Sequence, residues 1–245
     1  MLKKVFISIV VLLAVAYLAV AMTTFNRAPA DAVCGGVEFR FDTIGQQDAG
    51  FITQEGLKRL LQAHKLYPQG KKMDSIRCRD MEVCLEKSPF IRSAECYKTS
   101  SGRVCVEVMP RVPVLRVMAD NGEQFYLDTT DEIIPGAGYA VHLPVVTGTV
   151  TRKTASRLLH DLSLCIQQDA FWADQIEQIH VTPSGELEMA PRVGDHIIFL
   201  GKPKNVADKL ERLKTFYKKA LNKVGWNKYS RISLEFNNQI ICTKK

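Results

Sequence analysis

Apolar residues recur three and four positions apart in four stretches of the chain, which is the spacing of one buried helix face. In the first stretch Leu57, Leu60 and Leu61 share that face. The last stretch begins at Asn205, a residue type that caps helices, and Gly225 ends it. The pattern predicts helices over residues 53–68, 79–88, 151–168 and 205–224.

The last of these helices has a continuous apolar stripe beside many lysines. We expect the stripe to be buried and the lysines to lie on the solvated face. The residues of the predicted stripe are Val206, Leu210, Leu213, Phe216, Leu221 and Val224.

Elsewhere apolar and polar residues alternate, which predicts strands with one buried face. Asn121-Gly122 suits a type I′ turn between two of them. The strand order relative to the helices predicts a small α+β domain with a three-stranded sheet and two helices, and then a larger, mainly antiparallel β domain with two helices. The predicted strands cover residues 35–43, 90–98, 103–110, 114–128 (a hairpin), 142–148, 175–181, 185–190, 195–201 and 231–243.

The stretch from Arg231 to Thr243 is predicted as one strand close to the end of the sequence. Its apolar residues share one parity and its polar residues the other, as in a sheet that is buried on one face. Asn238 interrupts the apolar parity, and we expect a β-bulge there. If this strand lies at the edge of its sheet, its outer N–H and C=O groups need a partner or a shield.

The N-terminal segment carries Lys3 and Lys4 and then no charged residue from Val5 to Met22. This predicts a cytoplasmic tail (1–4), a transmembrane helix (5–22) and a linker (23–33), with the remainder outside the cytoplasmic membrane. A cleaved signal peptide is the competing interpretation, because Ala19-Val20-Ala21 fits a cleavage site. The sequence before Cys34 does not fit a lipoprotein signal.

The composition is that of a globular protein: among 245 residues, 46% are hydrophobic and 24% are charged. The net charge of +7 comes largely from the C-terminal part, where the basic residues fit a solvated helix face and do not indicate nucleic acid. The seven cysteines lack the spacing of a zinc site. A disulfide between Cys96 and Cys105 across a hairpin is possible on spacing, but simple packing of buried thiols fits equally well.

We find no motif for catalysis, for a cofactor or for phosphate binding. Asp128, Asp131 and Glu132 form an acidic cluster at a predicted hairpin end, and a solvated turn is favoured over calcium binding. We therefore do not expect an enzyme.

The order of these elements resembles the bacterial cell division family FtsQ (DivIB in Gram-positive bacteria). The resemblance rests on Glu82, Ser88-Pro89-Phe90, a hairpin and Arg111-Val112-Pro113-Val114, and on the later runs "NGEQFYLDTTDEIIP", "LPVVTG", "IIFLGKPKNVADKLERL" and "YSRISLEF". Ser233 departs from the usual aspartate, and the cytoplasmic tail is minimal. The tyrosines and cysteines suggest a Bacteroidetes-like version.

The resemblance implies a POTRA domain over residues 34–112 and an FtsQ-type β domain over residues 113–245. It further implies a non-catalytic scaffold of the divisome, single-pass in the inner membrane and enriched at the septum, which links early and late division proteins and regulates septal peptidoglycan synthesis. FtsB-like and FtsL-like proteins are the implied partners, the former by strand addition at the C-terminal edge, with other division proteins at the POTRA domain and no cofactor. The implied partner-binding residues are Tyr229, Ile232, Leu234, Glu235, Phe236, Asn237, Asn238, Gln239, Ile240 and Ile241.

Two alternatives stay open at this point. Another POTRA-containing transport or secretion component would be expected to carry further POTRA repeats or a barrel domain. A secreted enzyme would be released by signal cleavage. At the C-terminal edge itself, the lysines of "CTKK" are an alternative way to protect the strand without a partner.

Overall fold

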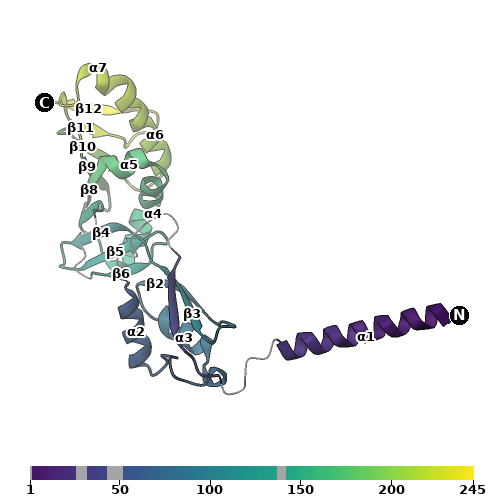
Figure 1. Cartoon of the computed structure of the whole chain (residues 1–245). Helices are drawn as coiled ribbons and strands as arrows, with labels where there is room; N and C mark the ends of the chain where they lie inside the picture. Colours follow the sequence, from purple (N-terminus) through teal and green to yellow (C-terminus); the bar gives the residue numbers. More distant parts are fainter. Residues whose placement is uncertain (1, 26–31, 43–51, 137–141) are drawn as a thin grey trace. The chain divides into compact units, whose positions relative to one another are not determined.

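The computed structural model describes residues 2–25, 32–42, 52–136 and 142–245, so most of the predicted linker lies outside the described residues. Helix α1 (Leu2–Phe25) covers the predicted membrane segment. In these ranges no helix is both long and apolar enough to cross a membrane. The chain divides between Met109 and Pro110 into two compact units, of which the first includes α1, and each is described by itself below (Figure 1).

The first unit has the predicted order of strand, helix, helix, strand and strand. Its three-stranded sheet has the order β1-β3-β2, and β1 pairs with β3 in parallel. The elements are β1 (Val37–Phe41), α2 (Gln54–Ala63), a single 3-10 turn η1 (Met73–Ser75), α3 (Cys78–Glu86), β2 (Ile91–Lys98) and β3 (Val104–Pro110).

Both helices of the first unit bury one face against this sheet. Leu57 and Leu61 of α2 and Met81 and Leu85 of α3 pack in one cluster with the inward residues of the strands. Thr53 caps α2, since its side chain accepts a hydrogen bond from the Gly56 N–H at 3.1 Å. The helical spacing of the leucines was therefore sufficient to place this core.

The seven cysteines are all free thiols, so the Cys96–Cys105 bridge does not form. Cys96 belongs to the cluster beneath the helices, whereas the Cys105 thiol contacts the Glu107 carboxylate, 3.9 Å away. At the end of the β2–β3 hairpin, the Thr99 N–H donates a hydrogen bond to the Arg103 carbonyl. This register puts Cys105 opposite Tyr97 and not opposite Cys96. The two thiols therefore lie on opposite faces. Burial raises the pKa of the Cys96 thiol to about 12.

The second unit contains a nine-stranded sheet in the order β12-β11-β10-β9-β8-β7-β4-β5-β6. Most pairings are antiparallel, as predicted, but β4 with β7, β7 with β8, and β10 with β11 are parallel. The strands are β4 (Pro113–Ala119), β5 (Gln124–Asp128), β6 (Ile133–Pro135), β7 (Val145–Gly148), β8 (Ile176–Val181), β9 (Leu187–Pro191), β10 (Ile197–Gly201), β11 (Tyr229–Ser233) and β12 (Ile241–Lys244).

The turn between β4 and β5 is not the predicted type I′ turn. Gly122 has φ 84°, whereas Asn121 is not among the residues with positive φ. The Gly122 N–H bonds to the Ala119 carbonyl, and the Ala119 N–H bonds to Glu123. This is a three-residue turn in which glycine alone takes the left-handed position.

Two long helical segments cover one face of the sheet, α4 (Arg152–Gln168) and the continuous run of α6 (Val206–Phe216), η2 (Tyr217–Leu221) and α7 (Asn222–Val224) (Figure 1). The short helix α5 (Ala170–Gln175) follows α4 and was not predicted. Asn205 does precede α6, but it has φ 52° and its side chain makes no capping bond. Its predicted capping role is therefore wrong.

The segment η2 is a π-helix, which explains an error in the predicted stripe. A π-turn holds one more residue than an α-turn, so the residues after it are rotated around the axis. Val224, predicted to be buried, is consequently 42% exposed. Tyr217, where the π-turn begins, lies four residues after Leu213 and takes a core position at 1% exposure by the regular helical period. Gly225 ends the helix with φ 93°, as expected.

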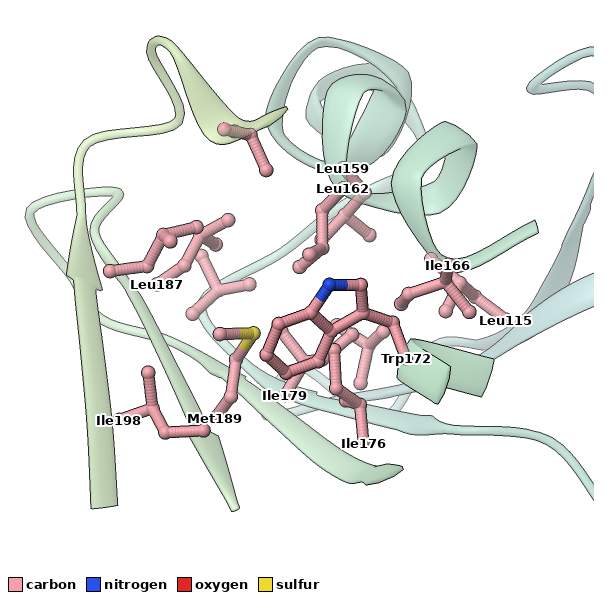
Figure 2. Close-up of a cluster of buried hydrophobic side chains, with 14 of the residues drawn as sticks. Leu115, Leu159, Leu162, Ile166, Trp172, Ile176, Ile179, Leu187, Met189 and Ile198 are labelled. Carbon is pink, nitrogen blue, oxygen red and sulfur yellow. The ribbon is translucent and has the colours of Figure 1, made fainter. Parts of the chain in front are cut away.

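The core of the second unit is centred on Trp172 of α5. Figure 2 shows its indole between the helices and the sheet, next to Met189, Ile176 and Ile179. Phe171 packs edge-on against it with ring centroids 4.9 Å apart. The short α5 therefore contributes the largest side chain of this core.

We expect Trp172→Ala to lower the free energy of unfolding of the second unit by about 3–5 kcal/mol, because it removes a large buried side chain. The neighbouring Phe171→Ala is the matched control, since Phe171 is only partly buried. Urea unfolding followed by circular dichroism measures both. Equal losses for the two variants would contradict the central place given to Trp172.

Candidate functional site

The predicted C-terminal strand is in fact a hairpin of two strands. β11 and β12 pair antiparallel, with Ile232 opposite Cys242 and Ser233 opposite Ile241. The loop over residues 234–240 reverses the chain, and Asn238 lies in it with φ 59°. Asparagine tolerates this left-handed backbone better than most residues. Asn238 thus turns the chain back, and the predicted bulge at this residue is wrong.

The hairpin redistributes the predicted partner-binding residues. Both edges of β11 are occupied, by β10 in parallel on one side and by β12 on the other. Tyr229 and Ile232 therefore lie in an inner strand, and Leu234 is buried in the core. Glu235, Phe236, Asn237, Asn238, Gln239 and Ile240 lie in the loop, and only Ile241 belongs to the edge strand.

β12 is one of the two edge strands of the sheet, with β6 at the other end. The outward backbone groups of β12 can be identified. The Lys245 N–H donates inward to the Lys228 carbonyl at 3.3 Å, and the Ser230 hydroxyl donates to the Thr243 carbonyl. Backbone groups of successive strand residues point to alternate sides. The N–H and C=O groups of Cys242 and Lys244 therefore point away from β11. We call these groups the docking edge.

Arg212 of α6 holds the hairpin loop. Its guanidinium donates to the carbonyls of Phe236 at 3.0 Å and Gln239 at 3.1 Å. These carbonyls lie on either side of the turn at Asn238, so one side chain fixes both ends of the turn. The role of Arg212 could not be predicted from the sequence, because a lysine- and arginine-rich helix face gives no sign of which cation contacts the backbone.

One turn earlier on α6, Lys209 is buried at 6% exposure. Its Nζ donates to the carbonyl oxygens of Leu200 at 2.7 Å and Lys202 at 3.1 Å. Burial lowers the pKa of this ammonium group. The two carbonyls at the end of β10 offset the cost of burying the charge. Lys209 was expected on the solvated face, and this expectation is wrong.

A groove of about 390 Å³ lies between the helix and the hairpin loop. Its apolar lining comes from Phe216, Ala220 and Ile240, and Lys219 and Arg212 lie beside them. Ile240 directly precedes β12. The groove, which we call the hairpin groove, is therefore contiguous with the docking edge.

A buried aromatic cluster supports this end of the sheet. The His196 Nε2 lies 2.7 Å from the Tyr217 hydroxyl, and Trp226 packs on the same tyrosine ring at 4.9 Å. Burial lowers the pKa of His196, and nearby Lys245 acts in the same direction, while the Trp226 backbone and Asp195 oppose them. The neutral imidazole is therefore the form that fits the folded state.

The acidic cluster at the end of β5 is not a solvated turn. Asp128 is 1% exposed, and its carboxylate accepts bonds from the Thr130 backbone and hydroxyl, the Glu132 N–H and, at 2.7 Å, the Arg111 guanidinium. Asp131 pairs with His160. The carboxylate thus organises a turn. No group of three or more histidine, cysteine, aspartate or glutamate side chains among the described residues suits a metal ion.

The sheet of the first unit also has an edge at β2, and a side chain covers part of it. The Cys96 N–H donates to the Glu82 carboxylate of α3 at 2.9 Å. Glu82 is 17% exposed and also pairs with Arg79. A carboxylate that occupies an edge N–H competes with any incoming strand. This edge is therefore partly closed, whereas a comparable contact is not seen at the outward groups of β12 in the described residues.

Two family models match the chain. Residues 32–109 match a POTRA-like domain, which defines the class of the first unit. Residues 112–243 match the model described as FtsQ/DivIB, C-terminal related. The chain therefore belongs to the FtsQ/DivIB family of cell division proteins. No curated protein matches the chain.

Family membership supports a general scaffold role in the divisome and a protein associated with the division septum. Members of the family are non-catalytic scaffolds that assemble with other division proteins. The family was predicted from the order of short motifs, and the matches confirm that prediction.

The buried His196 predicts a pH dependence of stability. Its pKa lies below the ordinary 6.5 in the folded state, so the unfolded chain binds the proton more readily. The contribution of neutral His196 to the free energy of unfolding is fully present above about pH 6.5. It is lost as the pH decreases toward the pKa of His196 in the folded state. We expect the urea midpoint to drop between about pH 7 and pH 5 in the parent protein.

His196→Gln is the control variant, because glutamine does not titrate and retains a polar group near the Tyr217 hydroxyl. Its urea midpoint should vary less over the same pH window. An equally steep decrease in the variant would show that other groups cause the effect.

Proposed function

We propose that this protein is a bitopic scaffold of the divisome that binds an FtsB-like partner by strand addition at the docking edge. Together with an FtsL-like protein, that partner would connect the chain to the regulation of septal peptidoglycan synthesis. The observation that carries the proposal is an edge strand with outward main-chain groups, in a chain of the FtsQ/DivIB family.

Strand addition satisfies the unpaired groups of the docking edge and derives affinity from main-chain hydrogen bonds. The surrounding side chains suit a protein contact, because Ile241 and Phe236 are 46% and 52% exposed. Shielding by lysines is the competing explanation for this edge. Lys245, however, pairs with Asp195 at 3.0 Å and is directed to that carboxylate.

The proposed contact set therefore centres on Ile241, Cys242, Thr243 and Lys244. The loop residues from Glu235 to Ile240 flank it, and Arg212 positions them. Tyr229, Ile232 and Leu234 support the edge from inside the sheet. We further propose that the first unit, over residues 34–112, contacts other division proteins and assists recruitment.

The proposal includes an N-terminal anchor in the cytoplasmic membrane, with the C-terminal units in the periplasm. It rests on the sequence: the run from Val5 to Met22 carries no charge and follows two lysines, which favours a cytoplasmic N-terminus. N-terminal sequencing of the mature protein tests it. A mature chain that starts near Met22 would contradict the anchor and favour signal cleavage.

We expect depletion of the protein in its own cells to produce filaments in which septation fails, as for a required divisome scaffold. Microscopy of depleted cells, with and without a complementing copy, measures the outcome. Normal division after verified depletion would argue against the proposed role.

A second prediction addresses the docking edge directly. Lys244→Pro removes one outward N–H and leaves the inner ladder to β11 intact, because proline is tolerated where the N–H faces solvent. We expect it to weaken binding of the FtsB-like partner about tenfold, the upper range for one lost hydrogen bond. Biolayer interferometry with the purified full-length chain in detergent measures the affinity.

Lys244→Ala is the matched variant, since it removes the same side chain and keeps the N–H. It should weaken binding by no more than about threefold. Thr243→Pro tests the inner side of β12. It removes an N–H that points toward β11, so it should unfold the hairpin. Equal affinities for Lys244→Pro and Lys244→Ala would reject main-chain pairing at β12.

A further inference from the structure

Backbone hydrogen bonds hold the chain on two sides where it enters the POTRA-like unit. On one side the Cys34 N–H donates to the Lys71 carbonyl at 2.9 Å, and the Cys34 carbonyl accepts from the Gly70 N–H at 2.9 Å. On the other side the Gly35 N–H donates to the Gly102 carbonyl at 3.0 Å. The loop after α2 and the end of the β2–β3 hairpin therefore lie beside the entering chain.

Both segments that flank the entering chain are basic. No acidic residue occurs from residue 56 to residue 73 or from residue 96 to residue 106. Several exposed cations of these segments form no ion pair within the described part of the chain. We call them the entry patch: Lys65, Lys71, Lys98 and Arg103.

Other cations of this unit do pair with carboxylates. The pairs include Arg40–Glu107, Arg59–Glu55, Arg77–Asp80 and Arg79–Glu82. Asp74 of η1 is an exposed carboxylate near the entering chain, and it offsets one cation of the entry patch. The entry patch therefore keeps a net positive charge.

The length of the chain confines the entry patch to a position near the end of α1. This helix ends at Phe25, three residues beyond Met22, where the uncharged run ends. An extended chain covers at most about 3.6 Å per residue, so the seven steps from Phe25 to Ala32 span no more than about 25 Å. If the uncharged run lies in the cytoplasmic membrane, as proposed above, the entry patch lies close to the lipid headgroups.

Apolar side chains next to the entry patch also suit a membrane interface. Val33 is 52% exposed, and it pairs with Lys72 in an isolated bridge. Tyr67 is half-buried in the loop after α2, and its hydroxyl donates to Gln69 at 3.3 Å. Tyrosine and long cationic side chains are typical of the boundary between headgroups and hydrocarbon.

We infer that the entry patch binds the phosphate groups of anionic phospholipids in the membrane that holds α1. This inference rests on the proposed N-terminal anchor and adds a second contact between the chain and that membrane. Each lysine or arginine near an anionic surface strengthens the attachment, and the Arg103 guanidinium suits a phosphate with two parallel hydrogen bonds. The contact would determine which side of the first unit is turned to the membrane.

An acidic protein segment is the other occupant that suits the charge of the entry patch. Such a segment would have to reach a surface that the chain holds within about 25 Å of the end of α1. The headgroups already lie at that place and need not be recruited. Lipid phosphate is therefore favoured over an acidic protein.

The test uses the full-length chain in nanodiscs of two compositions. One contains phosphatidylcholine alone, and the other contains phosphatidylcholine and phosphatidylglycerol in equal amounts. The uncharged reagent N-hydroxysuccinimidyl acetate modifies lysines, and mass spectrometry measures the rate at each one. Lys87 is the internal reference, because it is exposed and follows the end of α3 that is remote from η1.

We expect Lys65, Lys71 and Lys98 to react about fivefold more slowly in the discs with phosphatidylglycerol, the effect of one cation near an anionic surface. The rate at Lys87 should change by less than about twofold, because it lies more than a Debye length away. Most of the difference should disappear at about 0.5 M salt.

The double variant Lys98→Glu with Arg103→Glu should abolish most of the protection of Lys65 and Lys71, because it reverses the charge of half the entry patch. Lys87→Glu with Arg92→Glu is the matched control, since it makes the same change of charge at exposed positions. Arg92 lies near the start of β2, six residues from Lys98 and thus about 20 Å away. This control should leave the protection within about twofold of the parent.

Equal rates in the two kinds of disc would overturn the inference, and so would protection that persists in the double variant, because the tether alone would then explain it. Equal protection by about 10 mM inorganic phosphate in phosphatidylcholine discs would indicate a site for small anions. Protection by polyglutamate but not by phosphatidylglycerol would indicate an acidic protein. The anchor is judged separately: a chain that co-purifies with neither disc contradicts the anchor, and the inference is lost with it.

Discussion

Main-chain hydrogen bonding is the constraint on which the C-terminal part of this structure depends. Inside the sheet the backbone N–H and C=O groups of each strand pair with those of the neighbouring strands. This hydrogen bonding stops at the end of β10, in the loop after β11 and along the outer side of β12. Helix α6 resolves the first two cases with Lys209 and Arg212, which are three residues apart and therefore share a face. Lys209 binds the carbonyls after β10, and Arg212 binds those of the loop. The outer sides of β12 and of β6, the strand at the other end of the sheet, have no neighbouring strand among the described residues.

The edge strands β2 and β12 differ in how far side chains occupy their outward backbone groups. At β2 of the POTRA-like domain, the Glu82 carboxylate occupies the Cys96 N–H, so a strand that pairs there must displace a charged group. At β12 the edge is short, which limits aggregation, yet it lies beside a groove that combines apolar side chains with Glu211, Arg212 and Lys219. A short edge strand with distinctive neighbouring side chains is better suited to selective pairing with another strand than a long, flat edge strand.

The sequence was sufficient for most of the helices and strands and for the family, because periodic burial and ordered motifs are local signals. The short elements α5 and β6 were not predicted. It failed where one residue changed the geometry. Asn238 divided an apparently continuous strand, since alternation persists by chance across a turn. The π-helix moved Val224 outward, which no regular period predicts. The carbonyl contacts of Lys209 and Arg212 could not be predicted, because lysine and arginine are equally common on solvent-exposed helix faces. The parallel pairing of β10 and β11 depends on the crossover through α6, a non-local arrangement.

The π-helix also couples the surface of this helix to the core beneath it. Tyr217–Leu221 accommodates one residue more than a regular helix would, and the rotation it introduces sets the direction of every side chain up to Gly225. Deletion of a single residue in this segment would restore a regular phase and turn Lys223 around the helix axis, but it would also displace Leu221, which is fully buried. A change of one residue in length here therefore cannot alter the exposed face of the helix without a repacking of the core.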